Sequence, residues 1–163
     1  MKIRILGCDG GQLPGFSQVS FFINDHLVLD AGAITSTLSL KEQHKIGQIL
    51  ITHSHLDHIK DLCFLGENLY LSGSHHSITL FSSEAILTDI KKNIFNGIIW
   101  PDLTKMPDRQ NPIYVLRSIK KTLSIENLRI KAIPAVHSHA SLSFIISDAK
   151  GTVIISGDTG ATD

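Results

Sequence analysis

Short apolar runs separated by turn residues recur along the chain, and most have the length and alternation of β-strands. The pattern predicts strands at residues 2–6, 19–23, 26–29, 48–52, 78–81, 128–133, 142–147 and 152–155. It also predicts helices over 38–43, from 58 to about 65, and from 84 to about 93. Asn24 and Asp25 are typical of a tight turn between two strands. We therefore expect an α/β layered domain in which loops at strand ends carry function.

Composition favours one ordinary globular domain. The chain has 163 residues, 42% of them hydrophobic, which is enough for one core. Fifteen basic and fifteen acidic residues balance, so we expect no binding to duplex nucleic acid or to a membrane. Residues 1–7 alternate charged and apolar side chains, unlike a signal peptide or a spanning helix. We expect a soluble cytoplasmic protein with Cys8 and Cys63 as free thiols.

The most informative segment follows the apolar run at 49–52 and contains His53, His55, Asp57 and His58. If the strand continues into the motif, His53 and His55 point to the same side, whereas Asp57 and His58 lie where the next helix begins. A carboxylate is stabilised there by the partial positive charge of the helix. Imidazoles and carboxylates are ligands of Zn²⁺ and similar ions. The segment could therefore serve two neighbouring metal positions.

Two further candidate ligands, His137 and Asp158, lie at the ends of later apolar strands. His139 lies in the same loop as His137 and is its competitor. Four other histidines fit no ligand pattern and are expected at the surface: His26, His44, His75 and His76. Of these, His75 and His76 are candidates for lining a substrate cleft.

The spacing His-x-His-x-Asp-His at 53–58 resembles the signature of the metallo-β-lactamase superfamily. The resemblance implies an αββα sandwich and two divalent metal ions, with Zn²⁺ expected. In that pattern His137 supplies the third imidazole to the first ion, Asp158 bridges both ions, and Asp57 is both a ligand and a catalytic residue. Asp30 resembles an early aspartate that orients a ligand by accepting a hydrogen bond from its ring or from nearby backbone. A helix N-cap is the alternative for Asp30.

A pair of such ions explains how the chain could catalyse hydrolysis. Two ions about 3.5 to 4 Å apart can share a water, lower its pKa and hold a hydroxide as the nucleophile. They can also neutralise charge on a phosphoryl group. The sequence contains no Gly-x-Ser-x-Gly elbow, phosphate-loop lysine motif or dinucleotide fingerprint that would favour a different mechanism.

Outside this signature, the chain resembles the class II 3',5'-cyclic-nucleotide phosphodiesterases of the superfamily. The resemblance lies in residues 6–11, in Leu56 and above all in 90–102, where a helix ending in Ile-Phe-Asn is followed by Ile-Trp-Pro. It implies hydrolysis of cyclic AMP or cyclic GMP to the 5'-nucleotide, with the metals binding the cyclic phosphate. Trp100 either stacks on the base or anchors its proline-rich loop to the core.

The chain departs from the superfamily pattern after Asp158. Superfamily members continue into a second half of the sandwich and supply a last histidine to the second ion, and residues 159–163 contain none. We therefore expect 1–163 to be a metallo-β-lactamase-like domain that is incomplete at its C-terminus. Its uncovered strands should aggregate or be completed by a homo-oligomer or a second chain. The second ion should bind weakly, and catalysis by this chain alone should be poor.

Two other functions fit the same residues. One is a different hydrolase of this fold, acting on RNA 3' ends, a thioester or a lactam, although the absence of a basic patch disfavours RNA. The other is a truncated, non-catalytic chain that binds a metal or a nucleotide, or serves as an interaction partner. Metal content separates these cases, because two ions per chain favour an enzyme.

Overall fold

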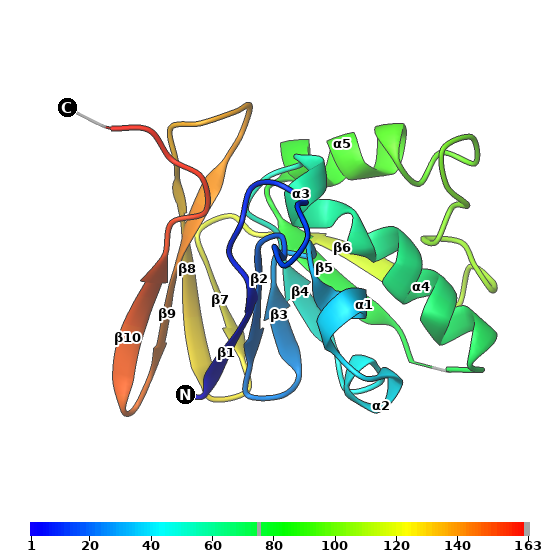
Figure 1. The fold of residues 1–163 in the computed structure, drawn as a ribbon, viewed down its shortest axis with the longest axis horizontal. Coiled ribbons are helices and arrows are strands. Elements are labelled where there is room, and N and C mark those ends of the chain that lie inside the picture. Colours follow the sequence, from blue (N-terminus) through cyan, green and yellow to red (C-terminus); the bar gives the residue numbers. More distant parts are fainter. Residues whose placement is uncertain (75, 162–163) are drawn as a thin grey trace.

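The computed structural model describes residues 1–74 and 76–161, which form two β-sheets and five helices (Figure 1). The helices lie along one face of a six-stranded sheet, and a four-stranded sheet covers its other face (Figure 1). This arrangement is the layered α/β fold that the sequence pattern predicts. Of the histidines discussed above, His75 lies outside the described residues.

The elements follow the apolar runs of the sequence. The six-stranded sheet contains β1 (Ile3–Gly7), β2 (Ser20–Ile23), β3 (Leu27–Leu29), β4 (Gln48–Leu50), β5 (Ile78–Ser82) and β6 (Tyr114–Ser118), paired in that order. The four-stranded sheet contains β7 (Thr122–Ile125), β8 (Leu128–Pro134), β9 (Leu142–Asp148) and β10 (Gly151–Ile155). The helices are α1 (Ile34–Thr37), α2 (Leu40–Gln43), α3 (Leu56–Ile59), α4 (Asp61–Leu71) and α5 (Glu84–Asn93).

The direction of the strands places the functional loops. Strands β3 to β6 are parallel, whereas β1, β2 and β3 are antiparallel. Asn24 and Asp25 have positive φ angles of 49° and 61° between β2 and β3, which confirms the predicted tight turn. Because parallel strands end at the same edge of a sheet, Asp30 after β3 and His53 after β4 are delivered to the same place.

Two apolar cores hold the layers together. Val28, Ile49 and Leu80 face the helices, whereas the next residues along β3 and β4, Leu29 and Leu50, face the four-stranded sheet. Both faces of the parallel strands are therefore buried, which explains their nearly continuous apolar sequence. Burial of each such side chain contributes about 1.5–3 kcal/mol.

The structure corrects several predicted boundaries. Strand β4 ends at Leu50 rather than at 52, because the backbone N–H of Thr52 donates to the side chain of Asp30 instead of to a neighbouring strand. His53 therefore lies in a loop, and His55 is the N-cap residue of α3, which contains Asp57 and His58. Helix α4 extends to Leu71, beyond the predicted end near 65. Strands β6 and β7 were not predicted.

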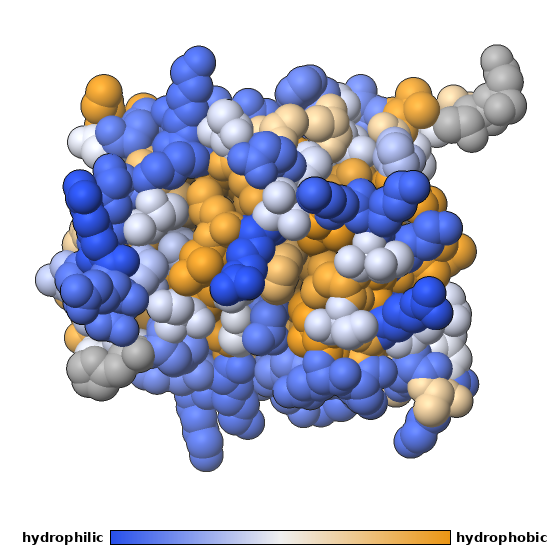
Figure 2. All heavy atoms as spheres, turned by 180° about the vertical axis from the view of Figure 1, so that it is seen from behind, coloured by the Kyte–Doolittle hydropathy of each residue, from blue (hydrophilic) through white to orange (hydrophobic). Residues whose placement is uncertain are grey.

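One opening between the two sheets is lined by apolar side chains. The outer strands β1 and β10 flank a groove formed by Ile3, Ile5, Phe21, Val153, Ile154 and Ile155. Ile5 and Ile154 are 63% and 64% exposed. Seen from behind, apolar side chains also reach the surface over the sheets, between rows of polar ones (Figure 2). Such exposed apolar surface beside sheet edges commonly binds another polypeptide.

Three smaller expectations can be compared with the structure. Cys8 is exposed and Cys63 is buried, and both are free thiols, as predicted. Trp100 packs edge-on against Phe64 of α4, with ring centroids 5.4 Å apart, which is the contact expected of a loop anchor. None of the helices in the described part of the chain combines the length and apolar character needed to cross a bilayer.

Candidate metal centre

Three imidazoles from distant parts of the chain meet at the edge where β4 ends. His53, His55 and His137 offer ring nitrogens that lie within 4.8 Å of one another. The Nε2 atom of His137 is 3.2 Å from Nδ1 of His55, and the ring centroids of His53 and His137 are 4.9 Å apart. These are the residues that the sequence assigned to the first ion. Their convergence is compatible with three ligands of one Zn²⁺ ion.

A second group lies beside the first and shares one residue with it. His53, His58 and Asp158 also place ligand atoms within 4.8 Å of one another. An Asp158 oxygen is 3.3 Å from Nε2 of His58, and its other oxygen is 3.5 Å from Nε2 of His137. Asp158 therefore reaches both groups, as a bridging ligand would. Its role as a ligand remains a prediction.

Asp57 lies at the side of this second group. One of its carboxylate oxygens is 3.6 Å from Nε2 of His58, and its side chain is 26% exposed. Asp57 is in the first turn of α3, as predicted. The group of His53, His58 and Asp158 contains His53 and not Asp57. A neutral imidazole nitrogen, however, has one lone pair and binds one ion at a time. When His53 binds the first ion, Asp57 is the neighbouring group able to complete the second.

The buried ring nitrogens have the properties expected of metal ligands. The Nε2 atoms of His53 and His58 are buried, and neither has a hydrogen-bond partner in the described part of the chain. Unpartnered buried nitrogens are costly, and a bound cation would satisfy them. Burial, followed by the nearby His58 and His55, lowers the pKa of His53 to about 4. The His53 ring is therefore neutral at pH 7 and has a lone pair available.

Asp30 makes the contacts expected of a residue that orients a ligand. One carboxylate oxygen is 2.7 Å from Nδ1 of His58, and the other accepts a hydrogen bond of 2.8 Å from the backbone N–H of Thr52. Burial alone would lower the pKa of His58, but the hydrogen bond and charge of Asp30 raise it. Asp30 caps neither α1 nor α2, whose N-cap residues are Ala33 and Ser39.

The other histidines lie outside both groups. His139 is exposed and belongs to neither group, so His137 has the better geometry of the two competitors. His44 contacts the hydroxyl of Ser72, and His76 contacts the backbone oxygen of Ile46. His26 is half-buried, with its side chain 19% exposed, and it lies 3.3 Å from an oxygen of the exposed Glu126.

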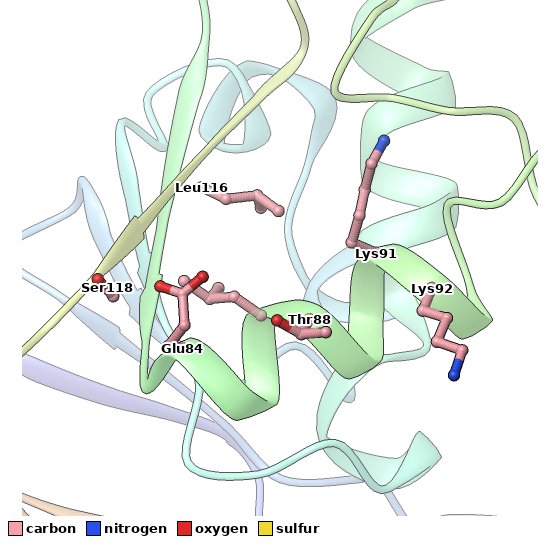
Figure 3. A pocket seen from close by; sticks show the side chains of 7 residues that line it. Glu84, Thr88, Lys91, Lys92, Leu116 and Ser118 are labelled. Carbon is pink, nitrogen blue, oxygen red and sulfur yellow. The ribbon is translucent and has the colours of Figure 1, made fainter.

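A nearby surface pocket has no part in this centre. Figure 3 shows it between α5 and β6, with Glu84, Thr88, Lys91, Lys92, Leu116 and Ser118 at its wall. The Lys91 ammonium already contacts the carboxylate of Asp102 and the hydroxyl of Thr104. This cation therefore serves to attach α5 to the loop after Trp100.

Gly32 gives the first testable prediction, because it lets the chain after Asp30 approach α3. A Cβ atom on Gly32 would lie 2.1 Å from the backbone oxygen of Asp57. Gly32→Ala should lower the free energy of unfolding by about 3 kcal/mol, since this backbone cannot move away freely. Urea denaturation measures the change. Gly47→Ala is the control, because nothing lies within 4 Å of a Cβ atom there, and it should change stability by less than about 1 kcal/mol. Equal effects at both glycines would contradict this packing.

Solved structures identify the fold of this chain. The metallo-beta-lactamase fold protein YhfI from Bacillus subtilis matches 99% of the chain with a TM-score of 0.75 and 16% identity. Unliganded yeast PDE1 matches 99% with a TM-score of 0.78 and 18% identity. Zn(2+)-bound PqqB from Methylobacterium extorquens matches 94% with a TM-score of 0.67 and 17% identity. The chain therefore has a metallo-β-lactamase fold, as predicted, and spans 63%, 66% and 61% of these three proteins.

A family model is more specific. The model of the cAMP phosphodiesterases class-II matches residues 28–157, and the chain belongs to this family. The 3',5'-cyclic-nucleotide phosphodiesterase 1 of Saccharomyces cerevisiae is 30% identical over 110 residues, covering 56% of this chain and 30% of that protein. The 3',5'-cyclic-nucleotide phosphodiesterase of Schizosaccharomyces pombe is 31% identical over 81 residues, covering 50% and 22%. The chain thus spans less than a third of either curated relative in these alignments.

Thr52 was missed by the sequence reasoning. Its side-chain oxygen lies 2.8 Å from Asp30, 3.1 Å from His53 and 3.4 Å from His58. The only available signal was its position immediately before His53, because a threonine at the end of an apolar run otherwise indicates only a strand.

Proposed function

We propose that this chain is the metal-binding part of a phosphodiesterase that hydrolyses 3',5'-cyclic nucleotides, cyclic AMP or cyclic GMP, to 5'-nucleotides. The observation that carries the proposal is the convergence of His53, His55 and His137 inside the region matched by the class-II family model. Both curated relatives have cyclic-nucleotide phosphodiesterase names, and one of the structural neighbours is Zn²⁺-bound. The cytoplasm, where such substrates occur, is the proposed location.

The residues divide between two proposed ion positions. His53, His55 and His137 would hold the first divalent ion, and Asp57, His58 and Asp158 would hold the second. Three imidazoles suit Zn²⁺, and two carboxylates in the second set would offset the charge of the ion there. When bound, the two ions would supply an activated water as nucleophile and neutralise charge on the cyclic phosphate.

The protein side chains contribute position and access. Buried Asp30 holds the ring of His58 through Nδ1, which directs its Nε2 atom toward Asp158. His55 and His137 are exposed and Asp158 is partly exposed, so a phosphate can approach the centre from that side. The negative charges of Asp57 and Asp158 would repel a phosphodiester in the absence of cations. Substrate binding should therefore require the metals.

The direct test is hydrolysis of cyclic AMP and cyclic GMP by zinc-loaded protein. His55→Ala should abolish turnover, because it removes a ligand of the first ion. The variant should still fold, because His55 is exposed and its loss leaves no cavity in the core. His44→Ala is the matched control, since His44 hydrogen-bonds the exposed Ser72 and belongs to neither ligand group, and it should keep wild-type activity. A parallel panel containing an RNA 3' end, a thioester and a lactam tests the other hydrolases. Turnover only on that panel, or turnover unaffected by His55→Ala, would refute the proposal.

Activity should also depend on completion of the fold. The chain spans about two thirds of its structural neighbours, and the groove between β1 and β10 is apolar and open. We propose that a homo-oligomer or a second chain covers this groove and supplies the remaining ligand of the second ion. The isolated chain should hold the second ion weakly and turn over slowly. If this chain hydrolysed cyclic nucleotides as fast as a longer polypeptide of the same family, the groove would need no covering chain for activity.

A further inference from the structure

Thr52 connects the segments that carry the candidate ligands. Its backbone N–H donates to Asp30, and its carbonyl oxygen accepts a hydrogen bond of 2.8 Å from the N–H of Leu142, at the start of β9. Gly157, which has a φ of 61°, packs against its side chain, and a Cβ atom there would lie 2.9 Å from that of Thr52. Thr52 is fully buried. The turn carrying Asp158 is therefore built directly against this residue.

The hydroxyl of Thr52 constrains the imidazole of His53. It donates its single proton to an Asp30 carboxylate oxygen at 2.8 Å. Toward Nδ1 of His53, 3.1 Å away, the same oxygen can then act only as an acceptor. Nδ1 of His53 must therefore carry the ring hydrogen. Nδ1 of His58 lies 2.7 Å from the same Asp30 oxygen, Oδ2, whose lone pairs can serve both contacts.

We propose that Thr52 is a positioning residue whose hydroxyl fixes His53 in the Nδ1–H tautomer and so keeps the lone pair on Nε2. That atom is buried and has no hydrogen-bond partner in the described residues, and His53 belongs to both candidate ligand groups. A group that hydrogen-bonds one ring nitrogen thus selects the other for a metal. The benefit to metal binding rests on the proposed function, but the tautomer is a property of the metal-free chain.

The tautomer can be measured by two-bond ¹H–¹⁵N spectra of ¹⁵N-histidine-labelled, zinc-free protein. Wild type and Thr52→Ser should show His53 with its hydrogen on Nδ1. Thr52→Val keeps the branched shape but lacks the hydroxyl, so His53 should shift to a mixture or to Nε2–H. Thr52→Ala also lacks the hydroxyl but adds no methyl group in its place, and it should behave in the same way. Thr35→Val is the matched control, because that hydroxyl also donates to a buried carboxylate, that of Asp61, and Asp61 belongs to neither candidate ligand group.

Zinc affinity gives an independent readout, measured by competition with a chelator. Thr52→Val should weaken binding by about 10- to 100-fold, with Thr52→Ser and Thr35→Val near wild type. An Nε2–H tautomer in wild-type protein, or Nδ1–H retained in both Thr52→Val and Thr52→Ala, would overturn the inference. If wild-type protein shows the Nδ1–H tautomer but binds no zinc, the proposed function fails while the role of Thr52 in setting the tautomer stands.

Discussion

Replacing His53 by alanine should remove zinc from the first ion position and so lower the zinc bound per chain. His53 is the one residue common to both candidate ligand groups found among the described residues, and its Nε2 atom is buried without a partner. Loss of a residue that merely orients a ligand weakens metal binding by about 10- to 100-fold, so loss of a ligand should exceed this range. Equilibrium dialysis followed by elemental analysis measures the zinc bound per chain.

His139→Ala is the matched control for His53→Ala. His139 is an exposed imidazole in the loop that also carries His137, and it belongs to neither ligand group. It should bind as much zinc as wild type. Circular dichroism of the zinc-free variants tests whether each remains folded. An unchanged zinc content in folded His53→Ala, or an equal loss in both variants, would show that the metal binds elsewhere.

Replacing Asp30 by alanine should cause the largest loss of stability. The fully buried carboxylate accepts hydrogen bonds from the N–H and hydroxyl of Thr52 and contacts Nδ1 of His58. Its removal leaves these donors unpaired in the interior. Breaking a buried charged pair in this way costs about 3–5 kcal/mol. Urea denaturation of zinc-free protein measures the change without a contribution from bound metal.

Asp25→Ala is an unusually close control for Asp30→Ala. Both aspartates have a positive φ, 61° for Asp25 and 57° for Asp30, so the backbone strain of an alanine is common to both variants. Asp25, however, is half exposed in the β2–β3 turn and pairs with the exposed Lys2. Such a surface pair contributes about 0–1 kcal/mol. A loss at Asp30 no larger than that at Asp25 would mean that the buried hydrogen bonds add nothing.

Much of the fold could be predicted from the sequence, because parallel strands buried on both faces leave continuous apolar runs. Residues 27–29 and 49–51 are such runs, and they form or overlap the central strands β3 and β4. Strand β6 was missed because Tyr114 follows a proline-rich segment and the strand ends in polar residues. Strand β7 was missed because it is only four residues long, although Leu123 and Ile125 alternate with polar neighbours. Short strands carry a weak periodic signal.

The candidate ligands could be selected from the sequence. Four of them lie together in the motif at 53–58 after a buried strand, and His137 and Asp158 each follow a later apolar strand. Their surroundings could not be predicted. The contacts of Asp30 with Thr52 and His58 span 22 and 28 residues of sequence, and no local pattern predicts contacts at that separation. The loop conformation at His53 depends on the same contacts, since Asp30 draws the backbone of Thr52 out of the sheet. Local propensity favours continuing the strand, but this buried hydrogen bond prevails.

Diffraction from zinc-soaked crystals, collected at the zinc absorption edge, tests the central claim most directly. The account predicts an anomalous peak bounded by the ring nitrogens of His53, His55 and His137, with a second, weaker peak beside His58 and Asp158. Absence of any peak within about 2.5 Å of the His53 Nε2 atom, at zinc concentrations that saturate binding in solution, would contradict it.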